Sequence, residues 1–264
     1  MALSSPPWPD PQNANRRWLV IGGALIAALC LCALALTAVT AWGIWDSVQK
    51  ANALAGAQAN ATATVQAAIV NPPIEWTRHY VDTFSPTSNL WDLKGSVANE
   101  RASGDFDVNG GEYDWHVYAN SPVVWWSTPS LPSQGDFIFK VDADHISGPT
   151  DNVAYGVIYR YQSGRNYSMF VVSEDGYFAI EKLANGNWSS LQDWTQSHAI
   201  NSESPNRLIV SASGGRFWFV VNDQVVAQLD DPTPAQGSFG LVVSVRASDT
   251  DLRLVFDNLE LYAP

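Results

Sequence analysis

The sequence predicts an all-β protein, a two-sheet antiparallel sandwich, that follows one transmembrane α-helix and a stalk. Three observations lead to this prediction. One uncharged apolar run occupies residues 18–45. From Ile74 onward, apolar and aromatic residues come in short runs separated by turn signals, as in antiparallel strands. No long helical pattern follows the stalk, so the natural way to bury a core is to pack one sheet on another.

The run WLVIGGALIAALCLCALALTAVTAWGIW at residues 18–45 is longer than the ~20 apolar residues that cross a bilayer as a helix. Tryptophans lie at both of its ends, where their rings favour the headgroup layer. Arg16 and Arg17 stand directly before the run and Asp46 directly after it. The positive-inside rule therefore predicts a single-pass protein of the cell membrane, with a cytoplasmic N-terminus and an extracellular C-terminal domain.

The rest of the chain divides by composition. Residues 1–17 are rich in proline and small polar residues, which predicts a disordered cytoplasmic tail. Residues 46–73 are rich in Ala, Asn, Gln and Thr and end at two prolines, which predicts a stalk. Residues 74–264 are expected to form the extracellular domain. The alternative is a signal peptide that is cleaved at a site such as Ala33-Leu34-Ala35, although the apolar part of such peptides spans only about 7–15 residues.

Cysteine usage and charge narrow the class further. Both cysteines, Cys30 and Cys32, lie inside the apolar run, so the exported part has no intramolecular disulfide. Its core must therefore hold together by packing alone, which a domain of about 190 residues can do. The net charge of the chain is −12, and almost all of the acidic residues follow the apolar run. This balance predicts that nucleic acid is not a partner.

Four tight turns separate apolar runs in the second half of the chain. Asn-Gly, Asp-Gly and similar pairs supply the positive φ angles that two-residue hairpins need. These pairs are Asp175-Gly176, Asn185-Gly186, Gly214-Gly215 and Asn222-Asp223. Further strands are predicted at Tyr80–Phe84, Glu112–Tyr118, Phe137–Val141, Val153–Arg160, Ser238–Val245 and Leu252–Leu261.

Alternation along two of these strands suggests a binding surface. In YGVIYRY, Ile158 and Arg160 share one side, and in RFWFVVN, Trp218 and Asn222 share one side. If the opposite side of each strand fills the core, these polar and aromatic residues lie on an outer, concave surface.

The order of motifs resembles a known fold family. The motifs are GVIYR (Gly156–Arg160), YSMFVV, GYFAIEKL, NRLIV, FVVNDQVV, GSFGL and VFDNLEL. Together they resemble the concanavalin A-like (laminin-G-like) jelly roll, and are most similar to the domain of 3-keto-disaccharide hydrolase-type bacterial surface proteins. The resemblance covers residues 80–262 and implies a jelly-roll sandwich with a concave face that often receives glycans. It matches Arg160 and Asn222 to an arginine and a hairpin asparagine of the family.

The same resemblance raises the question of catalysis. Retaining jelly-roll glucanases carry a Glu-x-Asp-x-x-Glu strand, and glycoside hydrolysis needs two carboxylates that flank the bond. The nearest match is Glu112 and Asp114, with Val117 in place of the third acid. Either these residues form a variant catalytic pair or they line the solvent-facing side of a strand.

No cofactor is predicted, and calcium is the one metal considered. Asp142, Asp144 and Asp151 could offer oxygen ligands to calcium, but no complete calcium-binding loop pattern is present. The histidines do not have zinc-site spacing.

Two tryptophans complete the set of candidate ligand contacts. Trp188 and Trp194 lie in NWSSLQDWTQSH, a segment that suggests an exposed loop. The leading hypothesis is therefore a membrane-anchored cell-surface module that binds a glycan or another envelope component through Arg160, Trp218, Trp188 and Trp194, without catalysis. The alternatives are a membrane-tethered glycoside hydrolase and a structural envelope protein, and the oligomeric state stays open.

Overall fold

The computed structural model describes residues 47–56, 66–67, 69–85 and 90–264. Contacts divide the chain into two compact units, residues 1–62 and 63–264. In the first unit, residues 47–56 form a helix with exposed side chains. The predicted cytoplasmic tail and the predicted membrane helix at 18–45 lie outside the described residues. Within the described ranges, the helices are too short or too polar to cross a bilayer.

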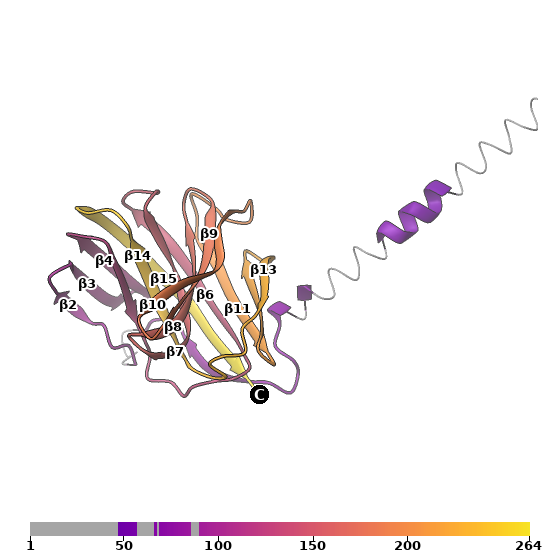
Figure 1. Cartoon of the computed structure of the whole chain (residues 1–264), viewed down its shortest axis with the longest axis horizontal. Helices are drawn as coiled ribbons and strands as arrows, with labels where there is room; N and C mark the ends of the chain where they lie inside the picture. The colour runs from indigo at the N-terminus through magenta and orange to yellow at the C-terminus, as the bar shows by residue number, and fades with distance from the viewer. Residues whose placement is uncertain (1–46, 57–65, 68, 86–89) are drawn as a thin grey trace, which may run out of the picture. The chain divides into compact units, whose positions relative to one another are not determined.

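The second unit is an all-β sandwich of two antiparallel sheets, as predicted (Figure 1). Its strands are β1 (Thr77–Asp82), β2 (Gly95–Ala98), β3 (Ala102–Asn109), β4 (Glu112–Ala119), β5 (Val123–Ser127), β6 (Phe137–Ser147), β7 (Val153–Ser163), β8 (Asn166–Ser173), β9 (Tyr177–Ala184), β10 (Asn187–Gln196), β11 (Asn206–Ser213), β12 (Arg216–Val221), β13 (Gln224–Asp230), β14 (Ser238–Val245) and β15 (Thr250–Ala263). The nine-stranded sheet has the order β13-β12-β11-β6-β15-β4-β3-β2, with β1 also paired to β15. The six-stranded sheet has the order β10-β9-β8-β7-β14-β5.

The four predicted turns are confirmed as hairpin connections between β8 and β9, β9 and β10, β11 and β12, and β12 and β13. In the last three, both turn residues have positive φ angles, for example 54° at Asn185 and 81° at Gly186. The structure adds β2, β3 and β5, for which we made no prediction. It also makes the segment around Trp188 and Trp194 a strand, β10, where the sequence suggests a loop.

The core lies between the sheets and is rich in aromatic residues. Tyr155, Val157 and Tyr159 of β7 face inward, and so do Phe217 and Phe219 of β12. On the opposite sides, Ile158 and Trp218 face outward, as the alternation predicts. Arg160 does not: its φ angle is 54°, and its guanidinium lies 5.2 Å from the centre of the inward Phe217 ring. However, β7 belongs to the six-stranded sheet and β12 to the nine-stranded sheet. The two outward sides therefore lie on opposite faces of the sandwich and cannot form one surface.

Residues that precede the first strand pack on the outer face of the nine-stranded sheet. The Ile69 side chain is only 7% exposed in this contact. The Gln66 side-chain amide donates a hydrogen bond of 2.6 Å to the backbone carbonyl of Asp223. The compact unit thus includes residues on the N-terminal side of Ile74. The cluster around Ile69 contains Ile138, Ile209 and Val220, bordered by Val70, Trp76, Trp218 and Tyr262.

Candidate functional site

The outer face of the six-stranded sheet is hollow. Arg246 directly follows β14, whereas Trp194 is on β10, four places away in the sheet order. Neighbouring strands lie about 4.8 Å apart, so these strands would be ~19 Å apart in a flat sheet. Yet the Arg246 Cζ atom lies 4.4 Å from the centre of the Trp194 ring, and Nη2 lies 3.3 Å from Glu181 Oε1 on β9. These side chains can meet only if the two lateral edges of the sheet curve toward each other.

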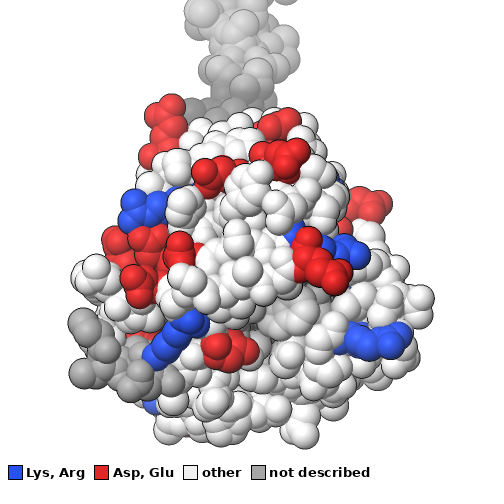
Figure 2. Space-filling model, turned by 90° about the vertical axis from the view of Figure 1, so that its left-hand side faces the viewer, with Lys and Arg blue, Asp and Glu red and all other residues white. Residues whose placement is uncertain are grey.

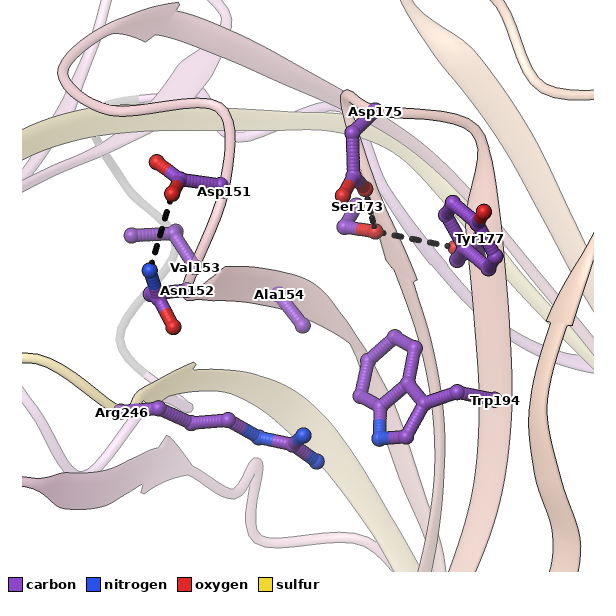
Figure 3. Close-up of a pocket in the computed structure, with 9 residues that line it drawn as sticks. All are labelled: Asp151, Asn152, Val153, Ala154, Ser173, Asp175, Tyr177, Trp194 and Arg246. Atoms are coloured by element: carbon purple, nitrogen blue, oxygen red, sulfur yellow. Dashed lines mark hydrogen bonds between the residues drawn. The ribbon is translucent and has the colours of Figure 1, made fainter.

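One end of this hollow face holds a cavity of about 410 Å³. Ala154 lies at its base, Asp151 and Asn152 come from the loop before β7, and Trp194 and Arg246 lie together at its lower side in the view of Figure 3. This volume is within the range of about 300–1,000 Å³ found for small-ligand pockets. The remaining lining residues are Val153, Ser173, Asp175 and Tyr177.

The polar groups of the cavity come from turns and from one buried donor. The Asn152 side-chain amide donates to Asp151 Oδ2 at 3.0 Å, and the Ser173 hydroxyl donates to Asp175 across the β8–β9 turn. The Trp194 Nε1–H is buried and has no hydrogen-bond partner among the described residues. Within the described part of the chain, this N–H therefore has no protein acceptor beside the cavity.

The other end of the same face carries four aromatic residues, here named the aromatic cluster: Trp126, Tyr161, Tyr167 and Trp188. The Tyr167 ring lies 5.3 Å from Trp126, 6.1 Å from Tyr161 and 5.7 Å from Trp188, measured between ring centres. Trp188 is 48% exposed. Ser173 in the cavity is six positions after Tyr167 on β8, which is ~20 Å along an extended strand.

The hollow face also contains a carboxyl group with a shifted pKa. Burial raises the pKa of Glu181, and the neighbouring Arg246 guanidinium acts in the opposite direction. Near the cavity, burial also raises the pKa of Glu174, whose carboxylate accepts a hydrogen bond from the Tyr155 hydroxyl. Glu174 is in the turn that carries Asp175, and its side chain is buried.

The structure places the four predicted ligand contacts in four different environments. Trp194 lines the cavity, and Trp188 belongs to the aromatic cluster on the same face. Trp218 lies on the outer face of the other sheet, where its Nε1–H donates to Gln228 at 3.1 Å. Arg160 is only 2% exposed and donates from Nη1 to the backbone carbonyl of Pro234 at 2.8 Å. The structure therefore does not bring the four residues together.

The hairpin asparagine, Asn222, has a structural environment. Its φ angle is 47°, its side-chain carbonyl accepts from the Arg207 backbone N–H at 2.8 Å, and its amide donates to the Ala199 carbonyl at 2.8 Å. These bonds close the turn between β12 and β13 against its neighbours.

The predicted catalytic pair lies on the nine-stranded sheet, away from the cavity. Glu112 is exposed at the start of β4, and Asp114 forms an ion pair with Arg253 of β15. Asp114 accepts two further hydrogen bonds from Arg253 Nε, at 2.9 and 3.0 Å. These contacts hold Asp114 against Arg253, and neither Glu112 nor Asp114 lines the cavity of the six-stranded sheet.

The calcium candidates are not brought together either. Asp142 and Asp144 are on β6, and Asp142 accepts a hydrogen bond from the Asn258 amide at 2.9 Å. Asp151 lines the cavity of the other sheet. The described parts of the chain contain no group of three or more His, Cys, Asp or Glu side chains that could hold a metal ion.

Several residues of the cavity were not predicted from the sequence to contact a ligand. Asn152, Asp175 and Tyr177 flank turns, and Arg246 follows a strand directly. In the sequence, the only feature that marks these residues is that they lie next to strand ends. The ends of neighbouring antiparallel strands lie together, so the residues of their loops gather at one end of the sheet. That feature does not say which loop residues point into the hollow face.

Comparison with known proteins finds similarity at the level of the fold. No protein-family model and no curated protein sequence matches the chain. The laminarinase catalytic domain from Thermotoga maritima, in complex with cetyltrimethylammonium bromide, is similar with a TM-score of 0.51 and 11% identity, over 72% of this chain and 98% of that chain. The β-glucanase of Bacillus licheniformis has a TM-score of 0.51 and 9% identity, over 70% of this chain and 97% of that one.

A carbohydrate-binding module, CBM66 from Bacillus subtilis, is also similar, with a TM-score of 0.47 and 19% identity, over 64% of this chain and 95% of that one. At such identities the similarity is one of fold. The architecture of residues 77–264 is thus a two-sheet jelly-roll sandwich, which agrees with the fold that the sequence motifs imply.

Proposed function

We propose that this chain binds neutral glycans through the cavity on the hollow face of the six-stranded sheet. The observation that carries the proposal is the combination of an indole, a guanidinium and two carboxylates around one cavity of about 410 Å³. A sugar ring has an apolar face, which suits the Trp194 ring, and a rim of hydroxyls. Hydroxyls donate to carboxylates such as Asp151 and Asp175, and accept from the N–H groups of Trp194 and Arg246.

The charges of the site favour a neutral ligand over an anionic one. Asp151 and Asp175 line the cavity, while the one cation there, Arg246, is shared with Glu181. A uronate or phosphate group would meet two acids and a guanidinium that already has a partner, and like charges brought together select against such ligands. Figure 2 shows one face of the molecule, where acidic and basic side chains lie in small separate groups among uncharged residues.

The fold gives independent but general support. One solved structure with this fold is a laminarinase catalytic domain and another is a β-glucanase, although the fold hosts many functions. The sequence motifs resemble the domain of 3-keto-disaccharide hydrolase-type surface proteins, and this resemblance also supports a glycan as the ligand.

The experiment that tests glycan binding compares two tryptophans on opposite faces. The full-length chain, purified in mild detergent, is applied to an array of neutral and anionic oligosaccharides. Trp194→Ala should lower the affinity for the best neutral glycan by at least about tenfold, because it removes the stacking surface. Trp218→Ala, on the other sheet, is the matched control and should bind as the wild type does. Absence of binding to every glycan, or equal loss in both variants, would refute the proposal.

We further propose that residues 18–45 anchor the chain in the cell membrane, with the N-terminus in the cytoplasm and the glycan-binding domain displayed outside. The proposal is supported by the length of the apolar run and by the two arginines before it. Protease added to intact cells should remove the C-terminal domain, and the mature chain should retain residues 18–45. A mature chain that begins after Ala35 would exclude the anchor.

A tethered glycoside hydrolase is the second candidate, and Glu181 is the observation that favours it. A carboxylic acid with a raised pKa in a hollow face is suited to act as a general acid, although hydrolysis also needs a second carboxylate. Activity on aryl glycosides that is abolished by Glu181→Gln would establish this candidate. Loss through Glu112→Gln would instead point to the nine-stranded sheet.

A further inference from the structure

The middle of the hollow face is covered by long side chains from its two sides. Ala154, Val171, Ala179 and Val242 are on the outer side of their strands, yet each is at most 3% exposed. The residues that pack over this cluster include Trp194 on the edge strand β10 and Trp126 on β5, the strand at the opposite edge of the sheet. The face is therefore not an open trough along its whole length.

Arg246 and Trp194 meet across the hollow. Arg246 enters from the β14 side, and Trp194 enters from β10. The guanidinium lies over the indole ring at 4.4 Å and contacts the Glu181 carboxylate at 3.3 Å, so it is held from two directions. Both residues point toward each other in Figure 3, along one side of the cavity.

The strand register places this contact between the cavity and the aromatic cluster. Along β9, the outward residues are Tyr177, then Ala179, then Glu181, then Leu183. Tyr177 lines the cavity, whereas Leu183 pairs with Tyr167 of the aromatic cluster. Glu181 therefore lies between the two ends of the face, and the side chains that it contacts separate them.

We propose that Arg246, Trp194 and Glu181 form a partition that makes the cavity a pocket for the end of a glycan chain. This inference rests on the proposed glycan binding and adds which part of the glycan is bound. A chain that continued from the cavity along the face toward Tyr167 would have to pass through the guanidinium and the indole. A terminal sugar residue meets no such obstacle, since the rest of its chain can leave into solvent.

The test uses length series of linear neutral glycans, from disaccharide to polysaccharide, together with cyclic glucans, which have no ends. For the full-length wild type, the affinity per chain should not change with length, and cyclic glucans should not bind. The number of protein molecules bound to a polysaccharide should follow its number of chain ends rather than its mass.

Arg246→Ala should open the partition. The variant should bind long chains at least about tenfold more tightly than the disaccharide, and it should bind cyclic glucans. Arg253→Ala is the matched control: its side chain is 47% exposed and ion-paired, against 45% for Arg246, but it lies on the other sheet. It should behave as the wild type does. Arg246→Lys keeps the charge but not the planar stacking, and it should show the same change to a smaller degree.

The outcomes separate the two proposals. If the wild type binds linear glycans with affinity that grows with length, or binds cyclic glucans, the end-of-chain inference is overturned while glycan binding stands. If Arg246→Ala and Arg246→Lys, both folded by their melting temperature, keep the wild-type preference for ends, the partition is not its cause and the inference also fails. If the wild type and the variants bind none of the neutral glycans, the proposed function itself is refuted.

Discussion

Replacing Ile69 with alanine tests whether the segment before the first strand is part of the folded domain. The Ile69 side chain is 7% exposed and packs on Ile138, Ile209 and Val220 of the nine-stranded sheet. Truncation of a buried isoleucine to alanine costs about 2–5 kcal/mol, and a site at the edge of the fold can partly collapse, so we expect about 2 kcal/mol. For a domain of this size, 1 kcal/mol shifts the melting temperature by about 2–4 °C, which predicts a loss of about 4–8 °C.

The same segment provides the control. Ile74 is fully exposed, at 102%, and Ile74→Ala should change the free energy of unfolding by less than about 0.5 kcal/mol. Both variants are measured as full-length chains in the same detergent, by thermal unfolding followed through tryptophan fluorescence. If Ile69→Ala melts within the error of Ile74→Ala, the segment does not stabilise the sandwich. The domain would then begin close to residue 74, as the composition of the sequence suggests.

Three further predictions concern polar groups of the sandwich. Asp231→Asn should lower the free energy of unfolding by about 3 kcal/mol in urea, because it breaks a pair with Lys182 in which both side chains are less than a fifth exposed. Asp114→Asn, which breaks the exposed pair with Arg253, should leave the urea midpoint almost unchanged, and a loss as large as that of Asp231→Asn would contradict this reasoning. The third prediction is for Glu174, where burial raises the pKa above its ordinary value of 4.5. The folded state then holds the proton to higher pH than the unfolded chain does, so the contribution of this carboxyl is full in acid and falls as pH rises through the folded pKa. As pH rises above 4.5, the urea midpoint of the wild type should therefore fall relative to that of Glu174→Gln. A wild-type midpoint that rises relative to the variant would contradict the raised pKa.

The strands that could be predicted are those with a strong local signal. Turn pairs such as Asn185-Gly186 need positive φ angles, and this requirement is local, so the hairpins that they close could be located from sequence. The strands β2 (Gly95–Ala98) and β3 (Ala102–Asn109) contain glycine, serine and aspartate in place of an apolar run. β3 pairs with β4 (Glu112–Ala119) across the Gly110-Gly111 turn, and β2 pairs with β3, so both pairings are local hairpins. The two strands are not predicted because their polar residues form no apolar run that would mark them.

The segment of β10 shows how edge position hides a strand. It pairs with β9 on one side only, and most of its residues are at least partly exposed, so it carries polar side chains on both faces. We expected exposed tryptophans there, and Trp188 is indeed 48% exposed. Trp194 lies six positions further along β10, beyond the bulges in this strand, and its ring is covered by the Arg246 guanidinium. Whether Trp194 is open or covered depends on Arg246, which is 52 positions away in sequence, and no local pattern predicts this contact.

Local sequence patterns also fail to show which strands belong to the same sheet. For this reason the sequence suggests a surface that contains Arg160 and Trp218, whereas the candidate site in the structure contains Trp194 and Arg246. Alternation correctly separates the inward Tyr159 and Phe219 from the outward Ile158 and Trp218. It cannot tell that the two outward residues belong to different sheets, because the side chains of every strand in a sandwich alternate with the same period. Assigning a strand to a sheet requires its hydrogen-bonded neighbours. Once these are known, the hollow face follows from a single long contact, that of Arg246 with Trp194, and the chemistry of the site follows from the residues that border this contact.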